Sequence, residues 1–182
     1  MSPGADFRMR QSHVRGFTLV ELLVTIAVLA ILIALGLPSF QGSLRSNRLA
    51  TTTNELLATL SLARTEAVRN TRGAAVCPSE DGTVCGGAWN QGWLVWSDLD
   101  SDGSLDANET TLRFTRVDDR LQVSGPGAGV LRFDARGRLE PSLGGAQQIG
   151  LKSEPCPATQ ELVRVINVNP TGQVNVEKEA CS

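Results

Sequence analysis

The chain has no tyrosine and only one histidine, His13, among its 182 residues. Catalytic Ser-His-Asp and Cys-His sets both need a histidine that exchanges protons near neutral pH. With its one histidine near the N-terminus, the sequence offers no such set, which argues against a hydrolase. The cysteine spacings also fit no paired CxxC knuckles, which argues against a zinc site. The sequence therefore gives no support to an enzyme.

An excess of charge of one sign is also missing. Lysine and arginine number 17 and aspartate and glutamate 19, so the formal net charge is −2. A slightly acidic balance argues against a generic nucleic-acid surface, although it leaves room for a local one. There is no internal repeat and no low-complexity tract. The length fits one globular domain beside a membrane segment.

Charged residues are nearly absent between Phe17 and Leu37, where Glu21 is the only ionisable residue. A helix of about 20 residues spans roughly 30 Å, the thickness of a bilayer core. Core helices of soluble domains rarely stay apolar over such a length. The preceding flank is basic: Arg8, Arg10, His13 and Arg15. We therefore predict a single-pass helix with a cytoplasmic N-terminus and with the rest of the chain outside the cytoplasm.

Glu21 is unusual because a carboxylate at the middle of a bilayer costs about 2.5–3.5 kcal/mol. It stands near the start of the expected helix, where the helix dipole favours negative charge and a partner amine can reach it. We interpret Glu21 as a docking group for another subunit. The alternative is an acid that merely extends to the membrane surface.

The order Gly16-Phe17-Thr18-Leu19-x-Glu21 before an apolar helix resembles the prepilin signature of type IV pilins and pseudopilins. The resemblance implies cleavage after Gly16 by a prepilin peptidase and N-methylation of Phe17. It further implies residence in the inner membrane and assembly into a helical filament. There, Glu21 would pair with the Phe17 amine of a neighbouring subunit.

Four cysteines follow the apolar segment, and an even number in an exported domain indicates disulfides. Three pairings are open. We favour Cys77–Cys85 and Cys156–Cys181 because each pair brackets its own loop or hairpin.

A long helix is expected to continue beyond Pro38, which should kink it rather than end it. Leu49, Leu56, Leu60, Ala63 and Ala67 form a helical stripe, and a glycine cap at Gly73 is expected near Arg72. Short β-like runs follow: 74–77, 92–97, 110–115, 129–133, 148–151, 162–168 and 173–176. Residues 169–172 look like a tight hairpin turn.

The predicted fold class is α+β, with one long N-terminal helix packed on antiparallel β-sheet, as in type IV pilins. The expected parts are a leader (1–16), a transmembrane or filament-core helix (17–37), its amphipathic continuation (38–72) and a β-rich periplasmic domain (73–182).

Within this class, the segment from Cys77 to Asp98 and the run 131–137 resemble the GspH/FimT family of minor pilins and pseudopilins. The resemblance implies a low-abundance subunit that initiates or caps a type IV pilus or a type II secretion pseudopilus, with other minor pilins or pseudopilins as partners. Some FimT-like members bind DNA through a Gly-Arg-x-Arg turn. The corresponding turn here looks like Gly172-Gln173-Val174-Asn175, in which both arginines are missing.

The acidic run 98–109 fits the calcium-loop template at every ligand position. The candidate ligands are Asp98, Asp100, Asp102, Ser104, Asp106 and Glu109. Gly103 allows the sharp turn. A structural calcium ion is one interpretation, and a solvated acidic turn between two strands is the other. No cofactor is otherwise required.

Two further clusters have a functional and a plain structural interpretation. Trp89, Trp93 and Trp96 form either a contact patch, with one indole of the expected strand facing outward, or core packing, which we favour. Arg132, Arg136 and Arg138 form either a phosphate-contacting strip for DNA or a charged sheet face. The interspersed acids favour the charged face.

Overall fold

The computed structural model describes residues 16–127 and 129–182, so most of the expected leader lies outside the described residues. Two compact units, Met1–Gln41 and Gly42–Ser182, are each described by themselves. The helix α1 covers Leu19–Asn70. In the described residues it is followed by β1 Gly73–Pro78, β2 Gly92–Ser97, β3 Thr110–Arg116, β4 Leu121–Ser124, β5 Leu131–Asp134, a 3-10 helix η1 Pro141–Leu143, β6 Gln147–Ser153, β7 Val163–Val168 and β8 Val174–Glu179.

The first part of α1, up to Gln41, carries apolar side chains that are exposed all round. Leu19, Leu23 and Ile31, for example, are each more than half exposed. Thr18 begins the helix, because its hydroxyl accepts a hydrogen bond from the Glu21 N–H at 3.2 Å. By length and composition, α1 is apolar enough to cross a membrane. The helix also continues through Pro38, as expected.

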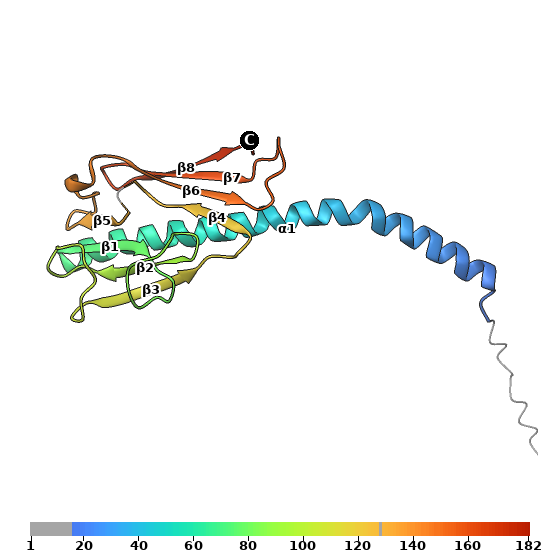
Figure 1. Cartoon of the computed structure of the whole chain (residues 1–182), viewed down its shortest axis with the longest axis horizontal. Helices are drawn as coiled ribbons and strands as arrows, with labels where there is room; N and C mark the ends of the chain where they lie inside the picture. The colour runs from blue at the N-terminus through green and yellow to red at the C-terminus, as the bar shows by residue number, and fades with distance from the viewer. Residues whose placement is uncertain (1–15, 128) are drawn as a thin grey trace, which may run out of the picture. The chain divides into compact units, whose positions relative to one another are not determined.

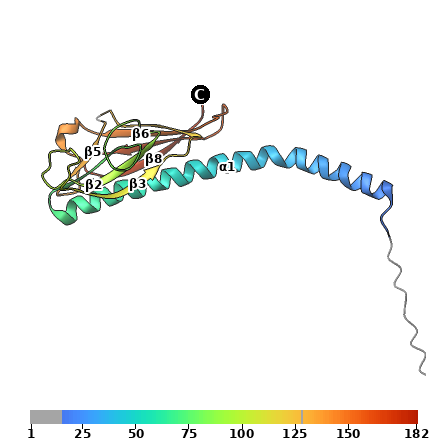
Figure 2. The ribbon, with the colours of Figure 1, turned by 60° about the horizontal axis from the view of Figure 1, so that its bottom comes forward.

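From Gly42 onward, α1 buries one stripe. Leu49, Leu56, Leu60, Ala63 and Ala67 are all fully or almost fully buried, as the sequence periodicity predicted. They pack in one core with side chains from both sheets, such as Val76 of β1 and Ile149 of β6. Figure 1 and Figure 2 show this part of α1 running along the β-strands.

Two four-stranded sheets complete the fold, with strand orders β3-β2-β1-β5 and β4-β6-β7-β8. All of the pairings between these strands are antiparallel. The α+β class, with one long helix packed on antiparallel sheets, is confirmed. Seven strands lie where the sequence predicted them, and β4, a run of only four residues, was not predicted. The turn 169–172 closes the β7–β8 hairpin, with the Gly172 N–H bonded to the Asn169 carbonyl at 2.8 Å.

The tryptophans belong to the core, as the favoured interpretation holds, and the contact-patch interpretation is wrong. Alternation does turn Trp93 and Trp96 to opposite faces of β2, but each face meets its own hydrophobic cluster. Trp96 packs with Leu94 and with Leu105 from the acidic loop. Trp89 is also buried, and its indole N–H donates to the Gly129 carbonyl at 3.1 Å. Loops therefore cover the outer face of β2, where an exposed indole was considered.

Both disulfides are local. The structure pairs Cys77 with Cys85 and Cys156 with Cys181, which is the pairing that the sequence favoured. The first disulfide fastens the loop after β1 to the end of that strand. The second fastens the C-terminal segment after β8 to the connection between β6 and β7.

The expected glycine cap at Gly73 is wrong. α1 ends at Asn70, Thr71 takes the left-handed conformation with φ 57°, and Gly73 is the first residue of β1. The Asn70 amide makes this end possible. Its oxygen accepts hydrogen bonds from the N–H groups of Arg72 (2.8 Å) and Gly73 (3.1 Å), and its nitrogen donates to the Gly73 carbonyl at 2.7 Å. One side chain thus satisfies the N–H groups of the two residues after Thr71, so the chain leaves the helix without a glycine in the left-handed conformation.

Glu66 connects the end of α1 to the end of β2. Although it is an acid, it is only 6% exposed. Its carboxylate accepts two hydrogen bonds from Arg69, both at 2.8 Å, and one from the Ser97 hydroxyl at 3.0 Å. Asn70 donates to the same hydroxyl at 2.8 Å. The hydrogen bonds from Arg69 are the main reason that the pKa of Glu66 lies below its ordinary value of 4.5.

We expect Glu66→Ala to lower the free energy of unfolding by about 1–3 kcal/mol, because it leaves the buried Ser97 hydroxyl without its acceptor. The loss should be present at neutral pH. It should shrink as the pH falls below about 4.5 and through the lowered pKa of Glu66, since protonation removes the same charged interaction from the parent protein. Urea unfolding of the full chain in detergent, followed by tryptophan fluorescence, measures both effects.

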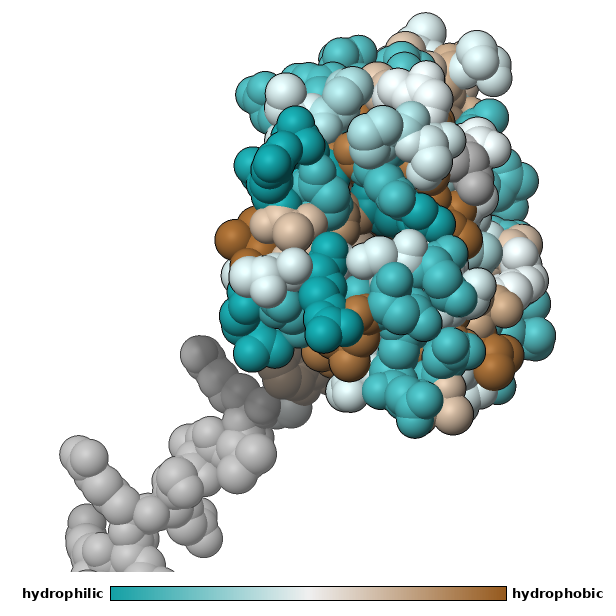
Figure 3. Space-filling model, turned by 90° about the vertical axis from the view of Figure 1, so that its left-hand side faces the viewer, coloured by the Kyte–Doolittle hydropathy of each residue, from teal (hydrophilic) through white to brown (hydrophobic). Residues whose placement is uncertain are grey.

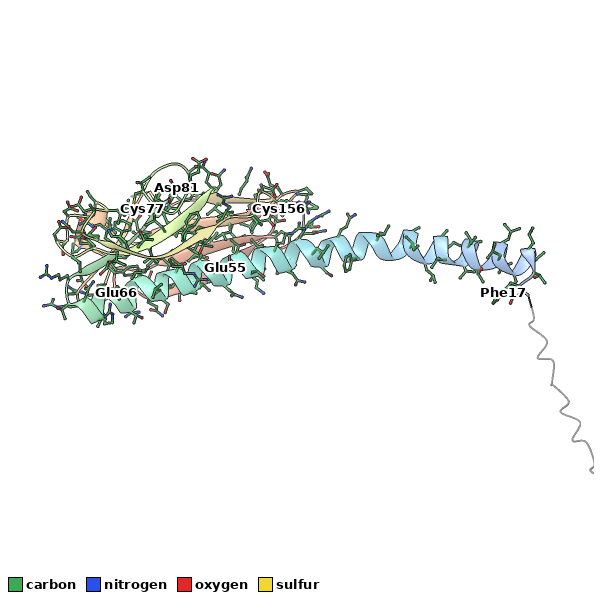
Figure 4. The ribbon with its side chains drawn as sticks, turned by 90° about the horizontal axis from the view of Figure 1, so that it is seen from below. Phe17, Glu55, Glu66, Cys77, Asp81 and Cys156 are labelled. Atoms are coloured by element: carbon green, nitrogen blue, oxygen red, sulfur yellow. A yellow bond between two sulfur atoms is a disulfide. The ribbon has the colours of Figure 1, made fainter. Side chains whose placement is uncertain are left out.

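Glu55→Ala is the matched control, because Glu55 lies on the same helix and is only half-buried (Figure 4). Its loss should stay near 0.5 kcal/mol or below. Equal losses for the two variants, or a Glu66→Ala loss that does not change with pH, would contradict the role given to Glu66.

Candidate functional site

The residues of the prepilin signature lie at the start of α1. Phe17 is 83% exposed and lies two residues before the first residue of the helix (Figure 4). Glu21 is in the first turn and is exposed. Its N–H is bonded to Thr18, whereas its carboxylate has no hydrogen-bond or ion-pair partner among the described residues. Gly16 is exposed before them. The geometry leaves both the peptide bond after Gly16 and the Glu21 carboxylate open to other molecules.

The acidic run 98–109 is the loop between β2 and β3. The last pair of that ladder is Ser97 with Thr110, so Asp98 and Glu109 are the first residues beyond it on each strand. The antiparallel register thus brings together the first and the last residue of the loop. The flanks are strands, as expected, and not the helices of an EF-hand. Figure 3 faces this end of the fold, where the surface is mostly hydrophilic.

Three carboxylates converge in this loop. Ligand oxygens of Asp98, Asp100 and Asp102 lie within 4.8 Å of one another. Near a protein surface, two unit charges at such a distance repel by roughly 3–4 kcal/mol. Asp98 is only 3% exposed, and its Oδ1 has no hydrogen-bond partner among the described residues. Burial, and then the charge of Glu109, raise the pKa of Asp98 above its ordinary value of 3.8.

Backbone hydrogen bonds fix the rest of the loop. The two oxygens of Glu109 accept from the N–H groups of Leu99 (2.7 Å) and Asp106 (3.1 Å), so this side chain closes the loop on itself. Asp102 accepts from the Ser104 N–H at 2.6 Å. Gly103 has φ 78°, which favours glycine, and an added Cβ would collide with the Arg132 guanidinium. Asp106 is exposed at the outer side of the loop.

The three arginines considered for DNA contact lie on or after β5, and two of them pair with acids. Arg132 forms an ion pair with Glu140, and Arg138 forms one with Asp134 at 2.9 Å. Arg136 is exposed in the turn between them. A guanidinium that is already matched by a carboxylate offers less to a phosphate. The arrangement corresponds to the charged sheet face that the sequence favoured.

A groove of about 920 Å³ lies beside β6 and the segment after β4. Its described lining consists of glycine, alanine, serine, glutamine, leucine and valine. None of these side chains can act as an acid or base near neutral pH. The groove therefore gives no support to catalysis.

Two interactions that hold the acidic loop in place were not predicted from the sequence. The Arg72 guanidinium donates to the Leu99 carbonyl at 2.6 Å, and Glu66 holds Ser97 at the entrance of the loop. Glu66 directly precedes Ala67, the last residue of the apolar stripe, and an acid beside such a stripe is the signal that could have revealed it.

Comparison with known proteins agrees with the fold. The sequence profile described as "Type II transport protein GspH" matches residues 52–172, and that of the "Prokaryotic N-terminal methylation motif" matches residues 11–37. No curated protein sequence matches the chain. The motif and the apolar helix together indicate membrane anchoring.

Solved structures are similar at low identity. The type IV minor pilin FimU of Pseudomonas aeruginosa is similar in two crystal forms, with 20% and 21% identity and TM-scores of 0.50 and 0.52. The alignments cover 70% and 72% of this chain and 91% and 90% of FimU. The minor pseudopilin EpsH from the type 2 secretion system of Vibrio cholerae has a TM-score of 0.49 at 11% identity, over 71% of this chain and 95% of EpsH.

The GspH profile covers well over half of the chain, the methylation motif covers its N-terminal segment, and the fold is that of a minor pilin. The chain therefore belongs to the GspH family of minor pilins and pseudopilins.

Proposed function

We propose that the protein is a minor, non-enzymatic subunit that initiates or caps a type IV pilus-like filament. The observation that carries the proposal is the first part of α1. It exposes apolar side chains on every side, contains one carboxylate, and starts two residues after Phe17. Such a surface is stable only in lipid or inside a bundle of similar helices.

The proposed sequence of events begins with a prepilin. A prepilin peptidase removes residues 1–16, and Phe17 is N-methylated. Residues 17–37 hold the subunit in the inner membrane with the N-terminus cytoplasmic, and residues from about Phe40 onward lie in the periplasm. Two disulfides suit that oxidising compartment. Assembly then moves the apolar helix from the membrane into the filament core.

Glu21 is the docking group in this proposal. Thr18 already accepts the Glu21 N–H, so the carboxylate is not needed to begin the helix. Inside a bundle of apolar helices, an unpaired carboxylate is costly, whereas a carboxylate beside the Phe17 ammonium of a neighbouring subunit is neutralised. Because the two groups are each fixed at one height along their helices, the pair also sets the axial register of the subunits.

A second candidate is a pseudopilin of a type II secretion system that acts in protein export. The description of the matching family as a type II transport protein favours it, whereas the fold shared with FimU favours a pilus. DNA uptake has no comparable support. The hairpin turn at 172–175 lacks arginine, and Arg132 and Arg138 are paired with acids.

We expect Glu21→Gln to leave membrane insertion intact and to lower incorporation into filaments about tenfold or more, because removing one partner of a buried ion pair costs roughly 3–5 kcal/mol. Glu21→Ala should have a similar effect. Sheared filaments and membranes are separated, and the amount of the chain in each is measured by immunoblotting. Normal incorporation of both variants would refute the docking role.

Thr18→Ala is the matched control. It removes the helix cap at 3.2 Å from the Glu21 N–H but leaves the carboxylate in place. Incorporation should fall much less than in Glu21→Gln. The mass of the mature chain shows whether each variant is still cleaved after Gly16, so that a defect in processing is distinguished from a defect in docking.

In-cell crosslinking of the mature protein, followed by mass spectrometry, separates the two candidates. We expect minor pilins of a type IV pilus among the crosslinked partners, because the apolar helix must be surrounded by similar helices in the filament. A crosslinked set made up of secretion pseudopilins would instead establish the second candidate, and the absence of pilin-like partners would contradict both.

A further inference from the structure

We propose that the loop 98–109 binds one calcium ion, held by the carboxylates of Asp98, Asp100 and Asp102 together with Glu109 and the Ser104 backbone carbonyl. Asp106 stands at the position that acts through water in such loops. The site goes beyond the proposed subunit function and does not depend on it.

The buried Asp98 carboxylate is the observation that points to a ligand. Asp98 is only 3% exposed, and its Oδ1 makes no hydrogen bond to any described residue. Buried carboxylate oxygens are nearly always paired, because an unpaired one loses its hydration without replacement. The Ser101 backbone N–H donates to the Asp98 carboxylate but leaves Oδ1 unpaired. The oxygens of Asp100 and Asp102 lie within 4.8 Å, so the unpaired oxygen faces further negative charge. A bound cation supplies the missing partner.

The topology completes the ligand set. Because Ser97 pairs with Thr110, the β2–β3 register brings Glu109 back to Asp98, although ten residues of chain lie between them. Hydrogen bonds from the N–H groups of Leu99 and Asp106 hold one oxygen of Glu109 each. Every carboxylate oxygen has a second lone pair, so these bonds orient Glu109 without preventing it from binding an ion.

The arginine side chains near the loop do not take the place of a calcium ion beside its carboxylates. Two guanidinium groups reach this loop, and both contact its backbone: Arg72 donates to the Leu99 carbonyl at 2.6 Å, and Arg132, which pairs with Glu140, donates to the Asp102 carbonyl at 3.2 Å. Both arginines therefore brace the backbone of the loop, and no hydrogen bond joins either of them to a loop carboxylate among the described residues. The turn at Gly103 makes the approach of Arg132 possible.

The donor set selects calcium. All the donors are oxygen, which hard cations prefer, and the four cysteines are held in disulfides. Carboxylates, one carbonyl and one water-mediated group supply the six to eight oxygens that calcium takes. Magnesium requires a stricter octahedron and retains more of its water. Because Leu105 packs on Trp96, the ion would fix a loop that covers the sheet, which is a structural role.

The test uses the full mature chain, purified in detergent and stripped with a chelator. Isothermal titration with calcium chloride should show one ion per chain, and thermal unfolding should shift to higher temperature. Magnesium chloride should give a much weaker response in both measurements. No heat and no shift with calcium, or an equal response to magnesium, would overturn the proposal.

Asp100→Asn and Asp102→Asn are the informative variants, because both side chains are exposed and asparagine keeps an oxygen that can accept the backbone hydrogen bonds from Asp102 and Ser104. Each should weaken calcium affinity about tenfold or more, and the double variant should abolish binding. In chelator the double variant should melt no lower than the parent, since the substitution removes repulsion between carboxylates.

Asp119→Asn is the control with the same chemical change, in the exposed connection between β3 and β4. It should bind calcium like the parent. Calcium binding that persists in the double variant, or that falls equally in Asp119→Asn, would place the ion elsewhere and overturn the assignment to this loop. A double variant that melts lower in chelator would also overturn the proposal, because it would mean that the carboxylates stabilise the loop without a metal.

Discussion

The stripe on the second part of α1 is the contact on which the rest of residues 42–182 depends. Each leucine in it contributes about 1.5–3 kcal/mol by leaving water, and the stripe meets side chains of both sheets in one core. Ala63 and Ala67, near the end of the helix, keep the side chains there short where the chain turns back into β1. Without this stripe, neither sheet would have a second layer to cover its inner face.

The outer face of β2 is covered by loops, and this explains why these loops are constrained so strongly. Every residue of β2 is buried, although one face of the strand does not meet α1. The loop after β1 is fastened by the Cys77–Cys85 disulfide. The acidic loop is fastened by Leu105 and by the closing contacts of Glu109. Both loops therefore act as part of the core, and their polar groups are placed by that packing.

The sequence predicted the features that depend on local pattern. Periodicity revealed the stripe, and the turn 169–172 revealed the β7–β8 hairpin. Two features that the sequence did not predict depend on a partner that is distant in sequence. β4 has only four residues and is defined by its pairing with β6. Glu66 lies buried beside Ser97, which is 31 residues away in sequence and donates to its carboxylate. Periodicity carries no information about such partners.

The candidate sites also divide into features that are contiguous in sequence and features that depend on distant partners. The signature at Gly16, Phe17 and Glu21 is contiguous in sequence and could be found without any structure. The acidic template also could be read directly, but whether its two ends meet depends on the register between β2 and β3. The sequence does not reveal that Asp98 is enclosed with an unpaired oxygen, because its enclosure depends on the surrounding side chains.

Two glutamates on α1 show how the same side chain acquires different roles. Glu66 is buried, and Arg69 and Ser97 satisfy its carboxylate within the subunit, so its role ends with the stability of the fold. Glu21 lies in an apolar segment, and no described residue of its own chain meets its carboxylate. Since such a charge is costly in any apolar surrounding, the group that compensates it must come from outside the described part of the subunit. The position of the partner, and not the acid itself, separates a structural glutamate from an assembly site.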